Sequence, residues 1–125
     1  MERMTGAHFR ALRTYLGYSV KEIADYLGVS QNSARAWDKG VYQPPAGVVE
    51  ELQELSDATD KAVEYLARHY SKSEIEWPME IPRTPEDIPD MLPQIIMPGP
   101  VTLDWWKMVG IRVCERVPGL TLEWA

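Results

Sequence analysis

Two short helical segments joined by a glycine turn constrain the fold of this chain more than any other feature of its sequence. Ser19 and Glu22 match the S-x-x-E capping box that starts a helix. Gly28 ends that helix, because glycine adopts the left-handed backbone of a tight turn. Ser30 can cap a second helix, which we expect over residues 31–39. Two helices of about two turns each, joined in this way, form a helix-turn-helix unit.

Longer helical patterns flank this unit on both sides. Before it, Thr5 can cap a helix whose apolar residues recur at helical spacing as far as Gly17. After it, Pro45 is placed to begin a long helix that reaches Tyr70. The side of this helix opposite its apolar stripe carries Glu50, Glu51, Glu54, Asp57, Asp60 and Glu64. We expect this acidic run to be a solvated helix face rather than a binding site.

The composition changes beyond the long helix. Seven of the ten prolines fall within positions 78–100, so regular structure there must be short. Apolar residues alternate with other residues over 75–81 and again over 120–124, which predicts two strands. A helix is expected over 103–117 between them. We expect the two strands to pair with each other, within or between chains, and to pack on this helix.

The predicted fold is therefore mainly α, and it has two parts. Residues 1–70 form a helix-turn-helix domain with a long final helix, and residues 74–125 form a small α/β appendage for dimerisation. Aromatic side chains are enriched in interface cores, and four of the five tryptophans lie in the appendage. The expected homodimer contacts are Trp77, Trp105, Trp106, Met108, Val109 and Trp124. A base-stacking platform is disfavoured, because few basic residues lie between these aromatics.

The charge of the chain is unevenly distributed. Its net charge is −6, which argues against a protein that coats nucleic acid. Residues 1–40, however, hold six Lys or Arg and only four Asp or Glu, which suits contact with a phosphate backbone at one end. No secretory signal or transmembrane run is visible, and the lone Cys114, expected to be a buried thiol, fits a cytoplasmic protein.

The second helix of the unit carries side chains that read base edges. We expect the following residues to face outward from it: Gln31, Asn32, Ser33 and Arg35. Arginine can bind guanine through two hydrogen bonds, and asparagine or glutamine can bind adenine in the same manner. Ser30, at the start of the helix, can help to hold a phosphate. The alternative for Arg35 is a salt bridge to Asp38.

The neighbouring basic residues allow two interpretations. Lys21 and Lys39 are candidates for phosphate contacts, and the alternative is that they are ordinary surface charges. Arg10 and Arg13 are expected to face partly outward from the first helix into solvent, and the alternative is a phosphate contact. Trp37 is expected in the small core that closes the helical domain.

This segment resembles the lambda-repressor-like (XRE) helix-turn-helix family over about residues 7–55. The matching residues are Glu22, Ile23, Ala24, Leu27, Gly28, Val29, Ser30, Gln31, Trp37 and Gly40. The resemblance implies that the first helix of the unit crosses the DNA backbone and the second lies in the major groove. Ala36 stands where many relatives place a long polar side chain, so base contacts would rest on the other outward residues.

A narrower resemblance concerns the order of elements along the chain. The helix-turn-helix, the long helix, the strand and a late helix with Trp106-Lys107-Met108 are similar to anti-CRISPR-associated (Aca-type) and YdiL-like regulators. This resemblance implies a C-terminal dimerisation region and a protein that represses its own operon.

Motifs for other chemistry are missing from the sequence. His8 and His69 lack carboxylate or cysteine neighbours at metal-ligand spacing, so we expect no metal and no cofactor. No nucleophile elbow, phosphate loop or carboxylate pair indicates an enzyme. The sequence therefore predicts a dimeric transcriptional regulator, most simply a repressor, that binds an inverted repeat in double-stranded DNA. The alternatives are an antitoxin with a small protein partner and an interaction module that has lost DNA binding.

Overall fold

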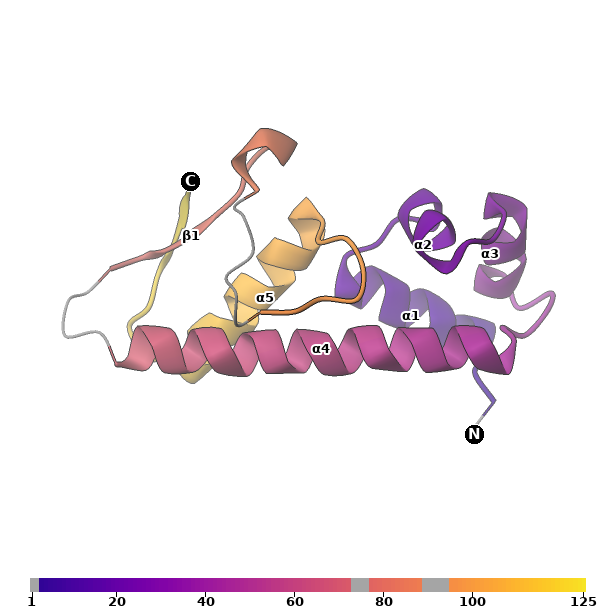
Figure 1. The fold of residues 1–125 in the computed structure, drawn as a ribbon, viewed down its shortest axis with the longest axis horizontal. Coiled ribbons are helices and arrows are strands. Elements are labelled where there is room, and N and C mark those ends of the chain that lie inside the picture. The colour runs from indigo at the N-terminus through magenta and orange to yellow at the C-terminus, as the bar shows by residue number, and fades with distance from the viewer. Residues whose placement is uncertain (1–2, 73–76, 89–94) are drawn as a thin grey trace.

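The computed structural model describes residues 3–72, 77–88 and 95–125, and it is mainly helical, as expected. Its elements, in chain order, are α1 (Gly6–Leu16), α2 (Val20–Leu27), α3 (Gln31–Asp38), α4 (Ala46–Ser71), β1 (Met79–Ile81), the 3-10 helix η1 (Pro85–Asp87), α5 (Leu103–Arg116) and β2 (Leu122–Trp124). Figure 1 shows α4 along the length of the molecule, with α1 to α3 at the end where α4 begins and the strands at the end where it finishes.

Local side-chain signals set the ends of the first three helices. Ser19 and Glu22 form both bonds of the capping box, at 3.1 and 2.9 Å. Ser30 Oγ accepts the Ser33 N–H at the start of α3. Gly17 and Gly28 end α1 and α2 with positive φ angles of 92° and 69°. The predicted starts and ends of these helices are confirmed to within one residue.

The long helix α4 lies within one residue of its predicted bounds. Pro45 is its N-cap rather than its first helical residue. One side of α4 is buried along almost the whole helix, and Thr59 fills the gap in the apolar stripe with a side chain that is fully buried. The hydroxyl of Thr59 donates to the carbonyl of Leu55 at 2.8 Å, so this buried polar group stays satisfied within the helix.

The two strands pair with each other in the same chain. They run parallel, with Met79 opposite Leu122 and Ile81 opposite Trp124. Of the segment predicted as the first strand, residues 75 and 76 lie outside the described residues, and Trp77 lies just before β1 with its side chain exposed. The pair packs against α5 at Gly110, where an added Cβ would lie 3.1–3.3 Å from Leu122 and Ile81. Only a small residue lets the sheet approach the helix this closely.

The tryptophans of α5 are part of the core of the chain itself. Trp105 and Val109 are fully buried and Trp106 is 6% exposed, in a helix that packs mainly against α4. Trp105 Nε1 donates to Thr59 Oγ1 at 3.1 Å, which fixes the ring inside. The expectation that these three side chains form a dimer interface is therefore wrong, because intrachain packing already covers them. The remaining three of the expected set are the half-buried Met108 and the exposed Trp77 and Trp124.

One core continues from the N-terminal helices into α5. Thr102 Oγ1 donates to the Gly17 carbonyl, and Tyr18 Oη donates to the Pro100 carbonyl at 2.6 Å. The buried apolar side chains of both regions belong to one cluster. The predicted division into residues 1–70 and 74–125 therefore does not separate two cores.

Two further expectations concern the membrane and the cysteine. Within residues 3–72, 77–88 and 95–125, no helix is both long enough and apolar enough to cross a membrane. Cys114 is half-buried rather than fully buried, and its burial raises the pKa of the thiol.

Candidate nucleic-acid interface

Helix α3 has one buried face and one exposed face. Ala34 is fully buried, and Trp37 packs edge-on against Phe9 with ring centroids 5.6 Å apart. This inner face holds α3 against α1, which confirms Trp37 as a core residue. Because residues three and four apart share a face of a helix, the opposite side carries Asn32 and Arg35, and both are exposed.

The exposed face of α3 carries a connected set of polar side chains. Arg35 Nη2 donates to Gln31 Oε1 at 3.1 Å, and Arg35 Nη1 donates to Asn32 Oδ1 at 3.4 Å. The structure thus brings together three of the predicted base-reading residues. Ser33 is half-buried beside them, and its hydroxyl accepts a hydrogen bond from Ser30 at 3.0 Å. These contacts are weak and solvated. The same donors and acceptors can therefore release one another and bind base edges instead.

Asp38 does not pair with Arg35, the alternative left open by the sequence. It binds Arg13 instead, through hydrogen bonds of 3.2 Å from Nε and 2.7 Å from Nη2. A third bond joins Arg13 Nη1 to the carbonyl of Tyr18 at 2.8 Å. The expectation that Arg13 faces solvent is therefore wrong, because the guanidinium lies in a nearly buried pocket between α1 and α3 with all its charge paired.

The two lysines next to this face are exposed, as phosphate contacts require. Lys21 Nζ binds Asp25 at 2.8 Å on the outer surface of α2, and this bond raises the pKa of the ammonium group. An exposed ion pair between residues four apart on a helix is weak, so Lys21 can release Asp25 and bind a phosphate oxygen instead. Lys39 lies at the C-cap of α3 and is also exposed.

Three acidic side chains of α2 and α3 are engaged in local contacts. Glu22 caps α2, Asp25 binds Lys21, and Asp38 binds Arg13. Arg35 and Lys39 make no ion pair with any of the residues that the structure describes. The positive charges of Arg35 and Lys39 are therefore open to an outside anion, although the start of α4 at the same end of the molecule carries exposed acidic residues.

The loop that follows α3 carries two exposed side chains that the sequence pattern does not predict as functional. Val41 and Tyr42 are 62% and 69% exposed, directly after Lys39 and Gly40. A tyrosine at the end of such a helix can donate its hydroxyl to a phosphate. No local pattern distinguishes such a residue from a core aromatic, because the loop has no helical or strand period.

Other kinds of site find less support. Among the described parts of the chain, no three His, Cys, Asp or Glu side chains are arranged to hold a metal ion. The chain matches no protein-family model, and no curated protein is similar to it.

Proposed function

We propose that this protein is a sequence-specific DNA-binding regulator of transcription, which reads the major groove with α3. The observation that carries the proposal is the hydrogen-bonded set of the half-buried Gln31 and the exposed Asn32 and Arg35, on a helix whose other face is fixed by Trp37. These side chains are the types that bind adenine and guanine through two hydrogen bonds each. The two eight-residue helices α2 and α3, with the left-handed Gly28 between them, support this proposal, because two short helices joined by a tight turn are typical of a helix-turn-helix unit.

In this proposal α2 crosses the sugar-phosphate backbone while α3 enters the groove. Lys21, Lys39 and the hydroxyl of Tyr42 contact phosphates and set the position of the protein on the duplex. Arg35 then turns from its helical partners toward a guanine edge. The acidic remainder of the chain stays away from DNA, because like charge opposes further contact.

One such head reads only a few base pairs, which is too little for selection within a genome. We therefore propose that the protein acts as a homodimer on an inverted repeat, where it blocks a promoter. Each protomer reads one copy of the half-site, and the two copies are related by the two-fold symmetry of the dimer.

Binding to a pool of random duplexes tests this proposal directly. We expect retention of duplex DNA over single strands, an affinity that falls steeply with salt, and enrichment of an inverted repeat over successive rounds. A protein that is folded by circular dichroism but retains no duplex at low salt would contradict the proposal. That result would favour the interaction-module or antitoxin alternative, both of which need a protein partner.

A further inference from the structure

The exposed face of α4 has a regular arrangement of charge. Lys61 lies near its centre, with Glu54 and Arg68 seven residues to either side and Glu50 and Lys72 eleven residues to either side. With 3.6 residues per turn, steps of seven and eleven residues return to within about 20° of the starting direction. These five side chains therefore form one straight stripe, and all five are exposed.

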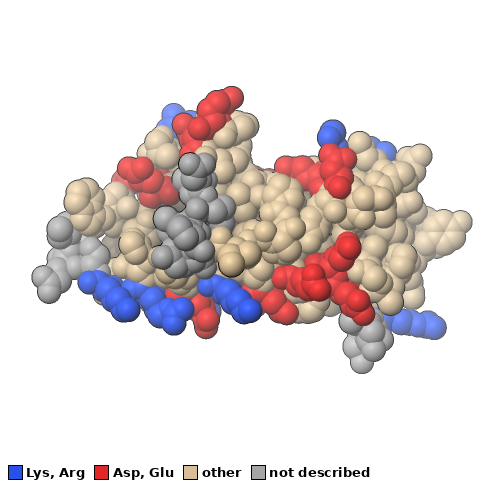
Figure 2. All heavy atoms as spheres, in the orientation of Figure 1, with Lys and Arg blue, Asp and Glu red and all other residues tan. Residues whose placement is uncertain are grey.

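The sign of the charge reverses along this stripe at Lys61. Residues 46–60 of α4 contain five acidic residues and no Lys or Arg, whereas residues 61–72 contain three Lys or Arg and one Glu. Figure 2 shows blue side chains gathered where the C-terminal half of α4 runs, and red ones nearer its beginning. The helix dipole alone does not explain this pattern, because its influence is confined to the end turns and the first turn of α4 has no acidic residue.

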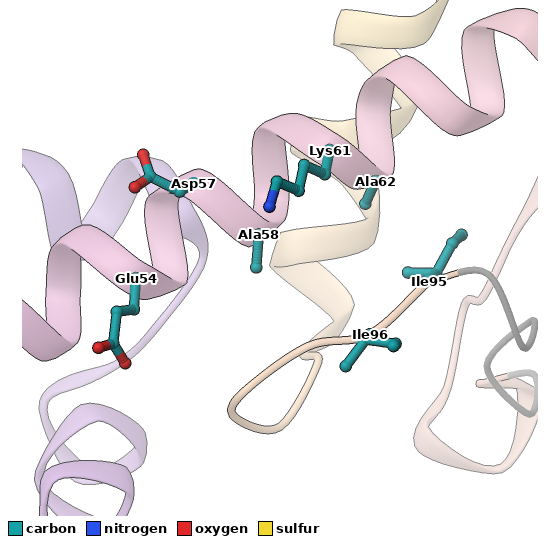
Figure 3. A pocket seen from close by; sticks show the side chains of 7 residues that line it. All are labelled: Glu54, Asp57, Ala58, Lys61, Ala62, Ile95 and Ile96. Atoms are coloured by element: carbon teal, nitrogen blue, oxygen red, sulfur yellow. The ribbon is translucent and has the colours of Figure 1, made fainter.

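A pocket lined by both charged and apolar side chains lies beside the centre of the stripe. It has a volume of about 500 Å³ and is formed between α4 and the segment that precedes α5. Figure 3 shows Ala58, Lys61 and Ala62 on one side and Ile95 and Ile96 across from them. The side chain of Ile96 is 81% exposed, so a large apolar group stands in water at this point. Cover of this side chain by a partner would remove apolar surface from water.

We propose that this face of α4 is the surface on which a second copy of the chain docks, with the two α4 helices antiparallel. A two-fold axis beside Lys61 places Glu54 opposite Arg68 of the partner subunit and Glu50 opposite Lys72 of the partner subunit. The symmetry makes each of these contacts twice, as an isologous interface requires. Lys61 lies near the axis and approaches Lys61 of the partner subunit, and the exposed Asp57 one helical turn away offsets this like-charge contact.

The pocket and Ile96 then lie near the middle of the interface, where Glu54 also lines the pocket, and the pairs of Glu50 with Lys72 of the partner subunit lie toward its ends. Apolar side chains near the centre with charged groups around them are the usual composition of a protein interface. The rim pairs fix the antiparallel register, while removal of the isoleucine from water supplies affinity. The same pairing covers part of the acidic surface near the DNA-reading end with positive charge from the partner.

The spacing of the two heads also favours this surface over the sheet. Helix α4 has 26 residues and is about 39 Å long, and the strands lie at the end away from α3. A dimer joined at its strands with the helices end to end would separate the heads by about twice that length. An axis at Lys61, fifteen residues after Ala46, places the two starts of α4 about 45 Å apart. This is closer to the about 34 Å between half-sites one turn apart.

This inference deepens the proposed DNA-binding function, since it names the contact that pairs the two heads. Its test needs no DNA, so the two can fail separately. Analytical ultracentrifugation of the full chain measures the dimer dissociation constant, and we expect a dimer at micromolar concentration. Glu54→Lys and Arg68→Glu, each alone, oppose like charges twice and should raise that constant more than about tenfold.

The double variant with Glu54→Lys and Arg68→Glu restores opposite charges and should recover the dimer. Glu123→Lys is the matched control, with the same change of charge at an exposed site on the strand β2. Far-UV circular dichroism spectra of every variant should match that of the parent, because all three positions are exposed. A monomeric parent, single variants that dimerise normally, a double variant that stays monomeric, or loss of the dimer with Glu123→Lys alone would each overturn the inference.

Discussion

Arg13 in α1 and Asp38 at the end of α3 form an ion pair whose side chains are only 8% and 10% exposed. The pair joins the first helix to the candidate recognition helix across 25 residues of sequence. A third hydrogen bond, to the carbonyl of Tyr18, satisfies the same guanidinium. The position of α3 on the core therefore depends on a polar contact as well as on Trp37.

Removing one member of this pair should destabilise the protein strongly. Asp38→Ala leaves the guanidinium of Arg13 buried without its carboxylate, and we expect a loss of about 3–5 kcal/mol in the free energy of unfolding. Urea denaturation measures this loss. The double variant Arg13→Met with Asp38→Leu should lose less, because it removes both charges. A single variant as stable as the parent would show that the pair is solvated.

Thr59 and Trp105 offer a second test of the polar contacts in the core. Thr59→Val keeps the shape of the side chain but removes the acceptor for the indole N–H, and should cost about 1–3 kcal/mol of stability. The matched control is Thr14→Val, because Thr14 also donates to the carbonyl four residues back but is exposed. That control should change stability by less than about 0.5 kcal/mol. Equal melting temperatures for the two variants would count against the buried bond.

Gly17 and Gly28 have the same left-handed backbone but different surroundings. An added Cβ at Gly17 would lie 2.3 Å from the backbone nitrogen of Trp105, whereas one at Gly28 would have nothing within 4 Å. Gly28→Ala should therefore cost only the backbone strain, about 1–2 kcal/mol. Gly17→Ala should cost clearly more, because α5 must also move. Thermal melts compare the two, and equal losses would mean that α5 does not press on this glycine.

The local structure of the chain could be predicted from patterns in its sequence, whereas its long-range contacts could not. Thr5, Ser19, Ser30 and Gly28 act on groups within a few residues, so their pattern predicted where helices begin and end. The same local pattern predicts that a helix ends at Gly17. Its second constraint, the backbone of Trp105, lies 88 residues away and leaves no mark in the local pattern.

The same limit explains the errors at Arg13 and in α5. An arginine on an amphipathic helix is usually solvated, and only the folded arrangement brings Asp38 to it. The apolar character of Trp105 and Trp106 predicted burial correctly but could not say against which surface. Of the four residues of α3 expected to face outward, Asn32 and Arg35 are exposed, because helical periodicity separates them from Ala34 and Trp37, whereas Gln31 and Ser33 are half-buried.

The continuous core leads to a prediction about truncation. A chain that ends at Lys72 lacks α5 and with it the partners of Gly17, Tyr18 and Thr59. We expect such a fragment to lose cooperative unfolding, because the apolar surface of α4 and α1 that faces α5 becomes exposed. Circular dichroism melts of the fragment and the full chain compare the two. A fragment that melts as sharply and as late as the parent would show that the N-terminal helices fold alone.

The central claim is that α3 reads DNA sequence, and Arg35 tests it most directly. Selection from random duplexes should give an inverted repeat for the parent. With Arg35→Ala, specific affinity should fall by about 1–3 kcal/mol and preference should relax at one base pair of each half-site. Lys21→Ala, the control, should weaken all sequences alike and flatten the salt dependence. An unchanged motif and affinity with Arg35→Ala would contradict the assignment of α3 as the reading helix.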